Sequence, residues 1–220
     1  MSIVTTIPRG WSASDIGDLT GKSFLITGGT SGIGKETALE LARAGAYVTI
    51  TARDAAKGAA VVAEIAKERV DFKLLDLADL ASVKNFAKEF TKQVDVLILN
   101  AGVMATPFSL TKDGFEMQMG TNHLGHFALT GLLREKVSQR IVAVSSQMHR
   151  AARISGITSD ELRNRSRGIG AYNPWSAYAL SKLANLLFIH EFERRSNRHG
   201  WNIEAVAAHP GYAATNLISG

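Results

Sequence analysis

Thr-Gly-Gly-Thr-Ser-Gly-Ile-Gly, residues 27–34, is the stretch that decides the fold, because it joins a short apolar run to an amphipathic segment. Residues 23–27 are predicted to form a buried strand, and residues 32–44 a helix whose apolar side chains share one face. Glycine permits a tight turn between them and lets a pyrophosphate approach the backbone. The free N–H groups at the positive end of the helix then hold the anion. A purely structural turn is the alternative interpretation.

The same strand–helix unit recurs along the rest of the chain. Further strands are expected over residues 47–52, 72–75, 94–99, 141–145 and 203–208, and further helices over residues 55–68, 82–92, 115–133 and 177–195. Short links between such units predict a parallel sheet with right-handed crossovers. The fold class is therefore α/β, a doubly wound parallel sheet of the Rossmann type with strand order 3-2-1-4-5-6. Such sheets bind ligands at the carboxyl ends of their strands.

Length and composition limit the class of protein. A chain of 220 residues, 45% hydrophobic and 20% charged, is that of an ordinary globular domain. Cysteine is absent, which excludes disulfides and thiolate metal sites and fits a reducing compartment, so a cytoplasmic location is expected. The net charge of +5 mildly favours anionic ligands, but no basic stripe with interleaved aromatic residues indicates nucleic-acid binding. We expect no membrane span and no signal peptide.

The chain divides into two parts on the same grounds. Residues 1–20 have no clear period and are expected to form an N-terminal arm, while residues 21–220 are expected to form a single domain of the Rossmann type. Within that domain, the irregular stretch 147–174 interrupts the alternation of strands and helices. A loop of this length is either a lid or binding loop, or a solvated surface excursion.

Tyr178 and Lys182 are four residues apart, so a helix places a phenol and an ammonium on the same face. A free tyrosine titrates at a pKa of about 10. A nearby cation is expected to lower that pKa toward neutral pH, where the phenol can do acid–base work. The spacing alone is a weak signal, but two hydroxyls, Ser145 and Ser146, end the fifth strand upstream. A serine hydrolase is disfavoured, because the chain lacks a Gly-x-Ser-x-Gly elbow.

Arg53 directly follows the second strand, where an acid usually meets the free hydroxyls of a ribose. A guanidinium can instead grip a 2′-phosphate bidentately, which predicts NADP(H) in preference to NAD(H). An ion pair with Asp54 is the alternative role for Arg53. Asp76 and Leu77 end the third strand, where Asp76 either faces an adenine ring or serves the entry to the next helix. A methyltransferase shares the fold class but would normally have an acid after the second strand.

Small residues follow the fourth strand. Asn100, Ala101 and Gly102 leave room for a planar ligand, and the asparagine side chain can lock the strand end. Asn122 lies inside a predicted helix, where asparagine competes with the backbone and normally needs a reason. Its role is either to hold a water molecule or to kink the helix.

Two histidines and the turn after the sixth strand are further candidates for a role in binding. His123 and His126 are three residues apart with no acidic partner nearby, so no metal site is expected. Pro210 and Gly211 turn the chain sharply after the sixth strand. The hydroxyl of Thr215 then lies where it can meet an amide.

These segments together resemble the short-chain dehydrogenase/reductase family, over residues 21 to 217. The matching motifs are, in order, the turn at 27–34, Asn-Ala-Gly at 100–102, the helix asparagine, the strand-end serine, Tyr-x-x-x-Lys at 178–182 and Pro-Gly at 210–211. Finer details resemble the retinol-dehydrogenase-like and protochlorophyllide-reductase-like branch. Those details lie at residues 100–104, 113–127, 172–175, 181–185 and 209–211.

The resemblance implies an oxidoreductase that transfers a hydride between NADP(H) and an alcohol or carbonyl substrate, a small and lipophilic alcohol, ketone or aldehyde. It makes Tyr178 the general acid/base, Lys182 the cation that lowers its pKa, Ser146 rather than Ser145 the group that orients the substrate oxygen, and Asn122 the support of a relay water. Cofactor contacts are expected from Thr27, Gly28, Thr30, Ser31, Gly32, Ile33, Gly34, Arg53, Asp76, Leu77, Asn100, Ala101, Gly102, Tyr178, Lys182, Pro210, Gly211 and Thr215.

Two departures from the family pattern are visible. Leu99 replaces the first asparagine of the usual Asn-Asn-Ala-Gly motif, which the family tolerates. The chain ends at Gly220, so the family's further helices and its last strand are expected to be missing. The sixth strand then becomes an open sheet edge with the apolar residues Ile203, Val206 and Ala208, which invites a second subunit and hence a homo-oligomer. The alternative function is a protein that binds NADP(H) with little turnover and acts as a sensor or scaffold.

Overall fold

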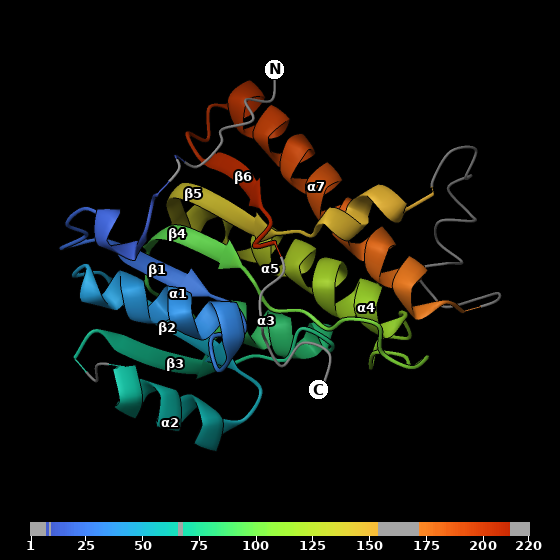
Figure 1. Cartoon of the computed structure of the whole chain (residues 1–220), viewed down its shortest axis with the longest axis horizontal. Helices are drawn as coiled ribbons and strands as arrows, with labels where there is room; N and C mark the ends of the chain where they lie inside the picture. The colour runs from blue at the N-terminus through green and yellow to red at the C-terminus, as the bar shows by residue number, and fades with distance from the viewer. Residues whose placement is uncertain (1–7, 9, 66–67, 154–171, 212–220) are drawn as a thin grey trace.

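The computed structural model describes residues 8, 10–65, 68–153 and 172–211. Six parallel strands form one sheet in the order β3-β2-β1-β4-β5-β6, so the predicted fold class and strand order are confirmed (Figure 1). The order reverses between β1 and β4, which are paired at the centre of the sheet. Doubly wound sheets bind their ligands at the carboxyl ends of the strands beside this reversal.

The strands and helices follow the predicted runs closely. The strands are β1 (Ser23–Ile26), β2 (Tyr47–Ala52), β3 (Val70–Leu74), β4 (Val94–Leu99), β5 (Val137–Val144) and β6 (Glu204–Ala208). The helices are α1 (Gly32–Arg43), α2 (Ala55–Ile65), α3 (Leu80–Glu89), α4 (Met117–Met119), α5 (Gly125–Leu133) and α7 (Pro174–His199). Short 3-10 turns are η1 (Ala13–Asp15), η3 (Arg134–Lys136) and η4 (Gln147–Ala151), and η2 (Gly120–Leu124) is a π-helical turn.

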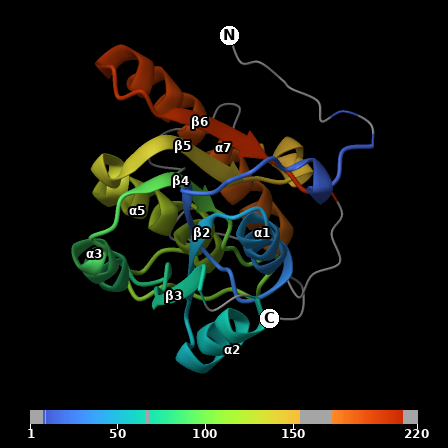
Figure 2. The same cartoon turned by 90° about the vertical axis from the view of Figure 1, so that its left-hand side faces the viewer.

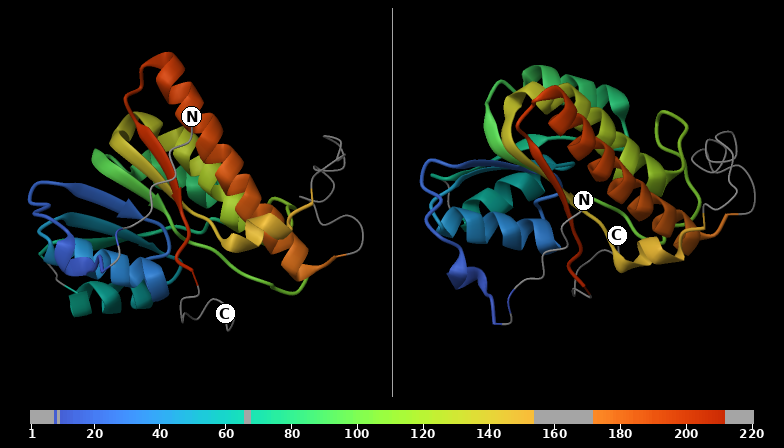
Figure 3. Two further views of the ribbon diagram at one scale, coloured as in Figure 1. Left: turned by 45° about the horizontal axis from the view of Figure 1, so that its top comes forward. Right: turned by 90° about the horizontal axis from the view of Figure 1, so that it is seen from above.

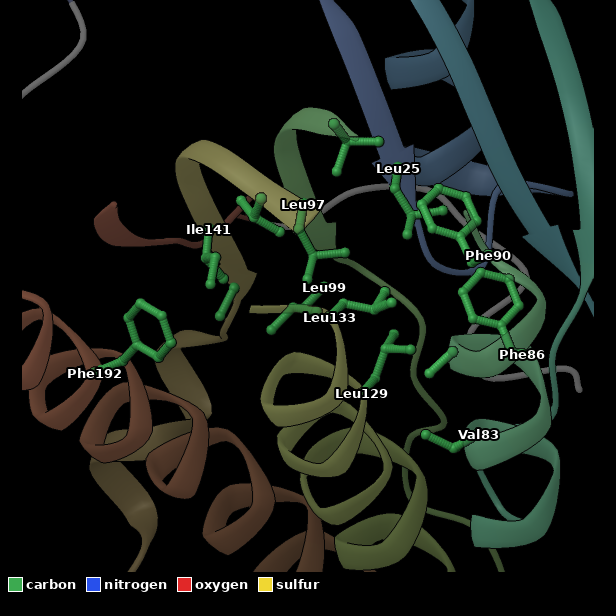
Figure 4. Packing of buried hydrophobic residues seen from close by; sticks show 14 of the residues in the cluster. Leu25, Val83, Phe86, Phe90, Leu97, Leu99, Leu129, Leu133, Ile141 and Phe192 are labelled. Atoms are coloured by element: carbon green, nitrogen blue, oxygen red, sulfur yellow. The ribbon is translucent and has the colours of Figure 1, made fainter. Parts of the chain in front are cut away.

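The helices cover both faces of the sheet and bury a separate core on each (Figure 2). Successive residues of a strand point to opposite faces, so Phe24 and Ile26 of β1 enter the core under α1 and α2, whereas Leu25 enters the other. That second core lies under α3, α5 and α7 and includes the stacked rings of Phe86 and Phe90 (Figure 4). Burial on both faces explains why β4 reads as an apolar run in the sequence.

The helix α7 is longer than predicted at both ends. It begins at Pro174 rather than residue 177, because the side chain of Asn173 accepts a hydrogen bond from the Ser176 N–H at 2.9 Å and proline occupies the first turn. It ends at His199 rather than residue 195, and Gly200 after it has a φ of +63°, the left-handed conformation of a C-terminal cap. Figure 3 shows this helix lying along β5 and β6, which it contacts.

Other elements differ from their predicted bounds by a few residues, and two depart further. The strand expected over residues 141–145 starts at Val137, because its amino end pairs with β4 at Val94 despite the polar side chains in between. The helix expected over residues 115–133 is broken into α4, η2 and α5. Of the two roles considered for Asn122, a local distortion of the helix is therefore observed.

The described part of the N-terminal arm is attached to the sheet. The N–H of Leu19 donates to the carbonyl of Ala44 at 2.8 Å, and the Leu19 side chain packs against the core under α1 and α2. Among the described residues, no helix has the length and apolar character needed to span a membrane. The division into an arm and one domain stays a prediction.

The outer strand β6 pairs with β5 alone among the described strands. The expected apolar edge is only partly correct, since Ile203 lies outside β6 and is buried in the core, where the hydroxyl of Ser196 donates to its carbonyl at 2.6 Å. Val206 is half-buried and Ala208 is exposed. The open edge is therefore shorter and less apolar than predicted.

Candidate active site

The residues predicted to bind a cofactor or a substrate gather at the carboxyl edge of the sheet. Thr27 follows β1, Arg53 follows β2, Asn100 follows β4, and Ser146 follows β5. Every strand pairing is parallel, so these strand ends face the same side of the molecule. The first turns of α7, which carry the Tyr–Lys pair, pack against η4 beside them.

Backbone geometry in the turn after β1 favours an anion. Gly28 has a φ of +70°, and a Cβ there would lie 2.8 Å from Cα of Ala101, so only glycine fits. Ser31 is the N-cap of α1, but no side-chain capping hydrogen bond is formed among the described residues. The first N–H groups of α1 therefore remain available for an anion. The other predicted contact residues of this turn are Thr30, Gly32, Ile33 and Gly34.

Asn100 locks the turn after β1 to the end of β4, as the sequence predicted. Its side-chain Nδ2 donates to the carbonyls of Thr27 at 2.9 Å and of Gly28 at 3.1 Å. In return, Oγ1 of Thr27 accepts the N–H groups of Asn100 at 2.9 Å and of Ala101 at 3.1 Å. The two strand ends thus hold each other rigidly where a cofactor is expected.

Arg53 is exposed at the end of β2, and its guanidinium has no ion pair or hydrogen bond within the described part of the chain. The alternative pairing with Asp54 is not formed, since the Asp54 carboxylate accepts the N–H of Lys57 at 2.9 Å at the start of α2. The guanidinium therefore remains available to an anionic ligand.

Asp76 and Leu77 occupy the loop between β3 and α3. The Asp76 carboxylate accepts the Ala78 N–H at 2.9 Å, and its own N–H donates to the Ser82 hydroxyl at 3.0 Å. Asp79, not Asp76, caps α3, with its carboxylate accepting the N–H groups of Ala81 and Ser82. Asp76 thus helps to form the entry to α3, while the Leu77 side chain is buried in the core.

The side chain of Asn122 is fully buried in the π-helical turn η2 and joins three segments. Its Oδ1 accepts the Val103 N–H at 2.8 Å, and its Nδ2 donates to the Val103 carbonyl at 2.9 Å and to the Ser181 hydroxyl at 3.0 Å. The distorted turn therefore connects the loop after β4 with α7, one residue before Lys182.

Lys182 is buried between the ends of β4, β5 and α7. Its Nζ donates to the Val144 carbonyl at 3.0 Å and lies 5.7 Å from the centroid of the Tyr178 ring. A Cβ on Gly102 would lie 3.1 Å from Oδ1 of Asn122 and 3.6 Å from Nζ of Lys182, so the small residue after β4 leaves room for both. The ammonium, the phenol and the asparagine are therefore close neighbours.

The two serines at the end of β5 face different partners. Ser145 is buried, and its hydroxyl donates to the Lys182 carbonyl at 2.9 Å, which fixes α7 to the sheet. Ser146 forms a side-chain hydrogen bond with Tyr178. Its hydroxyl also accepts the Met148 N–H at 3.2 Å as the N-cap of η4. Ser146, the serine preferred from the sequence, is thus the one beside the phenol.

Burial shifts the pKa values of both members of the Tyr–Lys pair. Desolvation lowers the pKa of Lys182 to about 8. Desolvation also raises the pKa of Tyr178, while the hydrogen bond with Ser146 lowers it. The expectation that Lys182 holds the pKa of Tyr178 below its ordinary value is therefore wrong. Desolvation of the phenolate raises this pKa by more than the hydrogen bond with Ser146 lowers it.

The turn after β6 is described only in part. Pro210 and Gly211 are exposed, and Gly211 has a φ of +71°, as the predicted sharp turn requires. The Gly211 N–H donates to Nδ1 of His209 at 3.3 Å. Thr215 lies outside the described residues.

A buried polar cluster at the entry to α7 was missed by the sequence analysis. The Tyr172 hydroxyl lies 3.0 Å from both the Thr106 carbonyl and a Glu116 carboxylate oxygen, which share its one proton, and it accepts a hydrogen bond from Gln118 at 2.9 Å. Gln118 also donates to the Pro174 carbonyl at 2.8 Å. The sequence offers one signal for this cluster, the charged residue Glu116 at the start of a predicted helix. Residue spacing cannot reveal its partner Tyr172, which is more than fifty positions away.

The two histidines of η2 and α5 have separate partners. His123 Nδ1 lies 3.1 Å from Oδ1 of Asn185, whereas His126 contacts Thr27 and the backbone of Asn122. Across the described residues, no three His, Cys, Asp or Glu side chains gather where they could hold a metal ion.

The model of a known family, short chain dehydrogenase, matches residues 22–158. Human retinol dehydrogenase 11 is 44% identical over 211 residues, which cover 91% of this chain and 64% of that protein. Human retinol dehydrogenase 13 is 43% identical over 210 residues, with 90% and 61% covered. The chain thus spans somewhat less than two thirds of the length of these curated relatives.

Solved structures agree with this relationship. An uncharacterised protein from Mycobacterium paratuberculosis is 50% identical with a TM-score of 0.85, covering 96% of this chain and 75% of that one. A short chain dehydrogenase from Burkholderia cenocepacia in complex with NADP is 26% identical with a TM-score of 0.71, covering 91% and 78%. With the fold, the order of motifs and the matched residues in agreement, the chain belongs to the retinol-dehydrogenase-like branch of the short-chain dehydrogenase/reductase family of oxidoreductases.

Proposed function

We propose that this chain carries the catalytic centre of an NADP(H)-dependent oxidoreductase that interconverts an alcohol and a carbonyl compound. The supporting observation is the meeting of Tyr178, Lys182 and Ser146 at the carboxyl edge of the sheet. A phenol with a buried ammonium and a hydroxyl beside it can exchange a proton with a substrate oxygen, which hydride transfer at the adjacent carbon requires. NADP(H), when bound, supplies or accepts that hydride.

Each side chain has a defined task in this proposal. Tyr178 gives its hydroxyl proton to the substrate oxygen in the reductive direction and recovers it in the oxidative one. Ser146 donates a hydrogen bond to the same oxygen and orients it. The ammonium of Lys182 contacts the cofactor, and Asn122, which donates to the Ser181 hydroxyl at 3.0 Å, supports a relay water. Burial of Tyr178 and Lys182, each 4% exposed, strengthens these electrostatic interactions.

NADP(H) is the proposed cofactor in preference to NAD(H). The exposed Arg53 guanidinium directly follows β2, which ends in Ala52 and not in an acid, so a cation lies where a 2′-phosphate is expected. The uncapped first turn of α1 suits the pyrophosphate. The 26% identical relative from Burkholderia cenocepacia, solved with NADP, adds support.

The proposed substrate is a lipophilic alcohol, ketone or aldehyde. Support comes from the curated relatives, which are retinol dehydrogenases. A cytoplasmic location is proposed on the absence of cysteine, and assembly with a second copy on the outer strand β6, which pairs with β5 alone among the described strands. Cell fractionation tests the location, and light scattering of the purified protein tests the assembly.

The deciding experiment incubates the purified protein with NADPH or NADH and a panel of aldehydes and ketones of increasing chain length. We expect one mole of alcohol for each mole of NADPH oxidised, with NADPH far better than NADH. A parallel fluorescence titration measures the affinity for each cofactor. Tight binding of NADPH without consumption of any carbonyl compound would favour the sensor or scaffold function instead.

A further inference from the structure

His126 links the nucleotide side of the site to its proton-transfer side. The imidazole is 1% exposed, inside the first turn of α5. Its Nε2 lies 2.8 Å from Oγ1 of Thr27, and its Nδ1 lies 2.9 Å from the backbone carbonyl of Asn122. The sequence separation between His126 and Thr27 is 99 residues, so only the fold brings them together.

The partners of His126 determine the position of each proton in the hydrogen bonds that join Asn122, His126 and Thr27. The Asn122 carbonyl can only accept, so Nδ1 carries the ring proton and donates it. Burial lowers the pKa of His126 to about 4, so the ring is neutral near pH 7 and Nε2 is an acceptor. The Thr27 hydroxyl must therefore donate to Nε2. Lys182 and His123, the charged and titratable groups that act on His126, both oppose its protonation.

This arrangement also fixes what the Thr27 oxygen does on its other side. With its proton directed to His126, Oγ1 has its lone pairs free for the N–H groups of Asn100 and Ala101, which it accepts at 2.9 and 3.1 Å. The competing acceptor, the Ile98 carbonyl, is farther away at 3.4 Å. The imidazole thus sets the orientation of the hydroxyl that joins the glycine turn to β4.

At its other end the imidazole holds the backbone of the residue assigned to the proton relay. The side chain of Asn122 is already committed to Val103 and Ser181. The carbonyl of Asn122, in the π-helical turn, also accepts a hydrogen bond from the His126 Nδ1–H. A single rigid ring thus joins the Thr27 hydroxyl to this carbonyl.

We propose that His126 is a positioning residue that couples occupation of the nucleotide site, through Thr27, to the placement of Asn122 for proton transfer. This inference rests on the proposed function for its effect on turnover. Its effect on nucleotide binding and the state of its ring do not depend on turnover.

Three substitutions of His126 distinguish its hydrogen bond to Thr27 from its hydrogen bond to Asn122. His126→Leu removes both hydrogen bonds, His126→Gln keeps an acceptor for Thr27, and His126→Asn keeps a donor for Asn122. We expect His126→Leu to weaken NADPH binding and to lower kcat, each by about three- to tenfold, the loss of roughly one hydrogen bond. His126→Gln should restore the affinity but not kcat, and His126→Asn should restore kcat but not the affinity.

His123→Leu is the matched control, because His123 lies one turn earlier and bonds to Asn185 instead. His123→Leu should lower the melting temperature and should not change NADPH affinity and kcat independently of each other. If the three His126 variants change only the melting temperature, or if the Gln and Asn variants behave alike, His126 has a structural role alone and the proposal is wrong.

Nitrogen NMR of the wild-type imidazole tests the coupling even if a variant does not fold. We expect the neutral tautomer with its proton on Nδ1 at pH 7, and a shift of the Nε2 resonance on addition of NADPH. A proton on Nε2, or a resonance that NADPH at saturation leaves unchanged, would overturn the proposal. Absence of turnover with every carbonyl compound would refute the proposed function, while NADPH affinities and ring spectra would still decide the role of His126.

Discussion

The two sides of the site are built in different ways. On the side of β1, β2 and α1, the groups suited to a nucleotide are backbone N–H groups and one exposed side chain, Arg53. On the side of β5 and α7, they are side chains of buried residues such as Tyr178 and Lys182, each 4% exposed. Anion binding by a backbone requires only the correct turn, whereas acid–base chemistry requires polar groups removed from water.

This difference has an electrostatic consequence. On the side of β5 and α7, burial disfavours the charged forms of both side chains. It lowers the pKa of Lys182 to about 8 and raises the pKa of Tyr178. Their stability depends on partners drawn from several elements, including Ser146, the Val144 carbonyl and Asn122. The buried half should therefore respond to substitution through chemistry and stability, and the exposed half through binding alone.

Tyr178→Phe gives the largest effect that this comparison predicts. The variant keeps the ring and loses only the hydroxyl, so we expect kcat to fall by about 10²–10⁴ while NADPH affinity stays within about threefold. Steady-state kinetics and a fluorescence titration measure the two quantities. Tyr47→Phe is the control, because Tyr47 is 56% exposed at the far end of β2. Near-normal turnover by Tyr178→Phe would refute the proposed mechanism.

Lys182→Met should separate function from stability. The pKa of Lys182 is about 8 in the folded protein against its ordinary value of 10.5, so the unfolded state binds more protons between these two pH values. The stability contribution of Lys182 therefore rises with pH across this window. At pH 7 the Met variant should gain up to about 3 kcal/mol in unfolding free energy relative to wild type, while losing turnover.

Chemical denaturation of both proteins from pH 6 to 10.5 measures this effect. The stability advantage of Lys182→Met should shrink as the pH rises above 8. Lys84→Met, at an exposed position of α3, should show no such dependence. A difference in unfolding free energy between Lys182→Met and wild type that stays constant at all pH values would show that burial does not destabilise the ammonium.

Arg53→Ala tests the side of the site formed by β1, β2 and α1, where binding alone should respond. Loss of one charge-assisted contact should weaken NADPH binding by about 1.5–3 kcal/mol, or roughly ten- to a hundredfold, and leave NADH nearly unchanged. The melting temperature should not move, since the guanidinium has no partner among the described residues. Arg43→Ala, whose residue pairs with Glu40 at 2.7 Å, is the control. Equal binding of both cofactors by the wild type would contradict the assigned preference.

Tyr172→Phe should have the smallest effect of the series. It removes a hydroxyl that contacts Glu116, Gln118 and the Thr106 carbonyl but leaves the ring against Phe108. We expect a loss of about 1–2 kcal/mol in unfolding free energy, because buried groups lose a hydrogen-bond partner. Thermal melts measure this loss, with the Tyr47→Phe variant for reference. A loss of turnover without a loss of stability would instead place Tyr172 in the chemistry.

The sequence by itself determined the architecture and the neighbourhood of the site. Apolar runs of strand length, glycine after β1 and the alternation with helices were sufficient for the sheet order, because these signals are local and repeat. The same signals placed Thr27, Asn100 and Ser146 at the ends of adjacent strands. Parallel strands must end on one side, so their convergence followed from the fold class alone.

Only the tertiary structure decided how the polar groups are partnered. It turned Ser145 toward the Lys182 carbonyl and Ser146 toward Tyr178, and it broke the helix at η2, where Asn122 bonds to Val103. It also reversed the expected shift in the pKa of Tyr178. Burial and hydrogen-bond partners depend on residues distant in the chain, such as Thr27 and His126, 99 positions apart, and no local spacing encodes them.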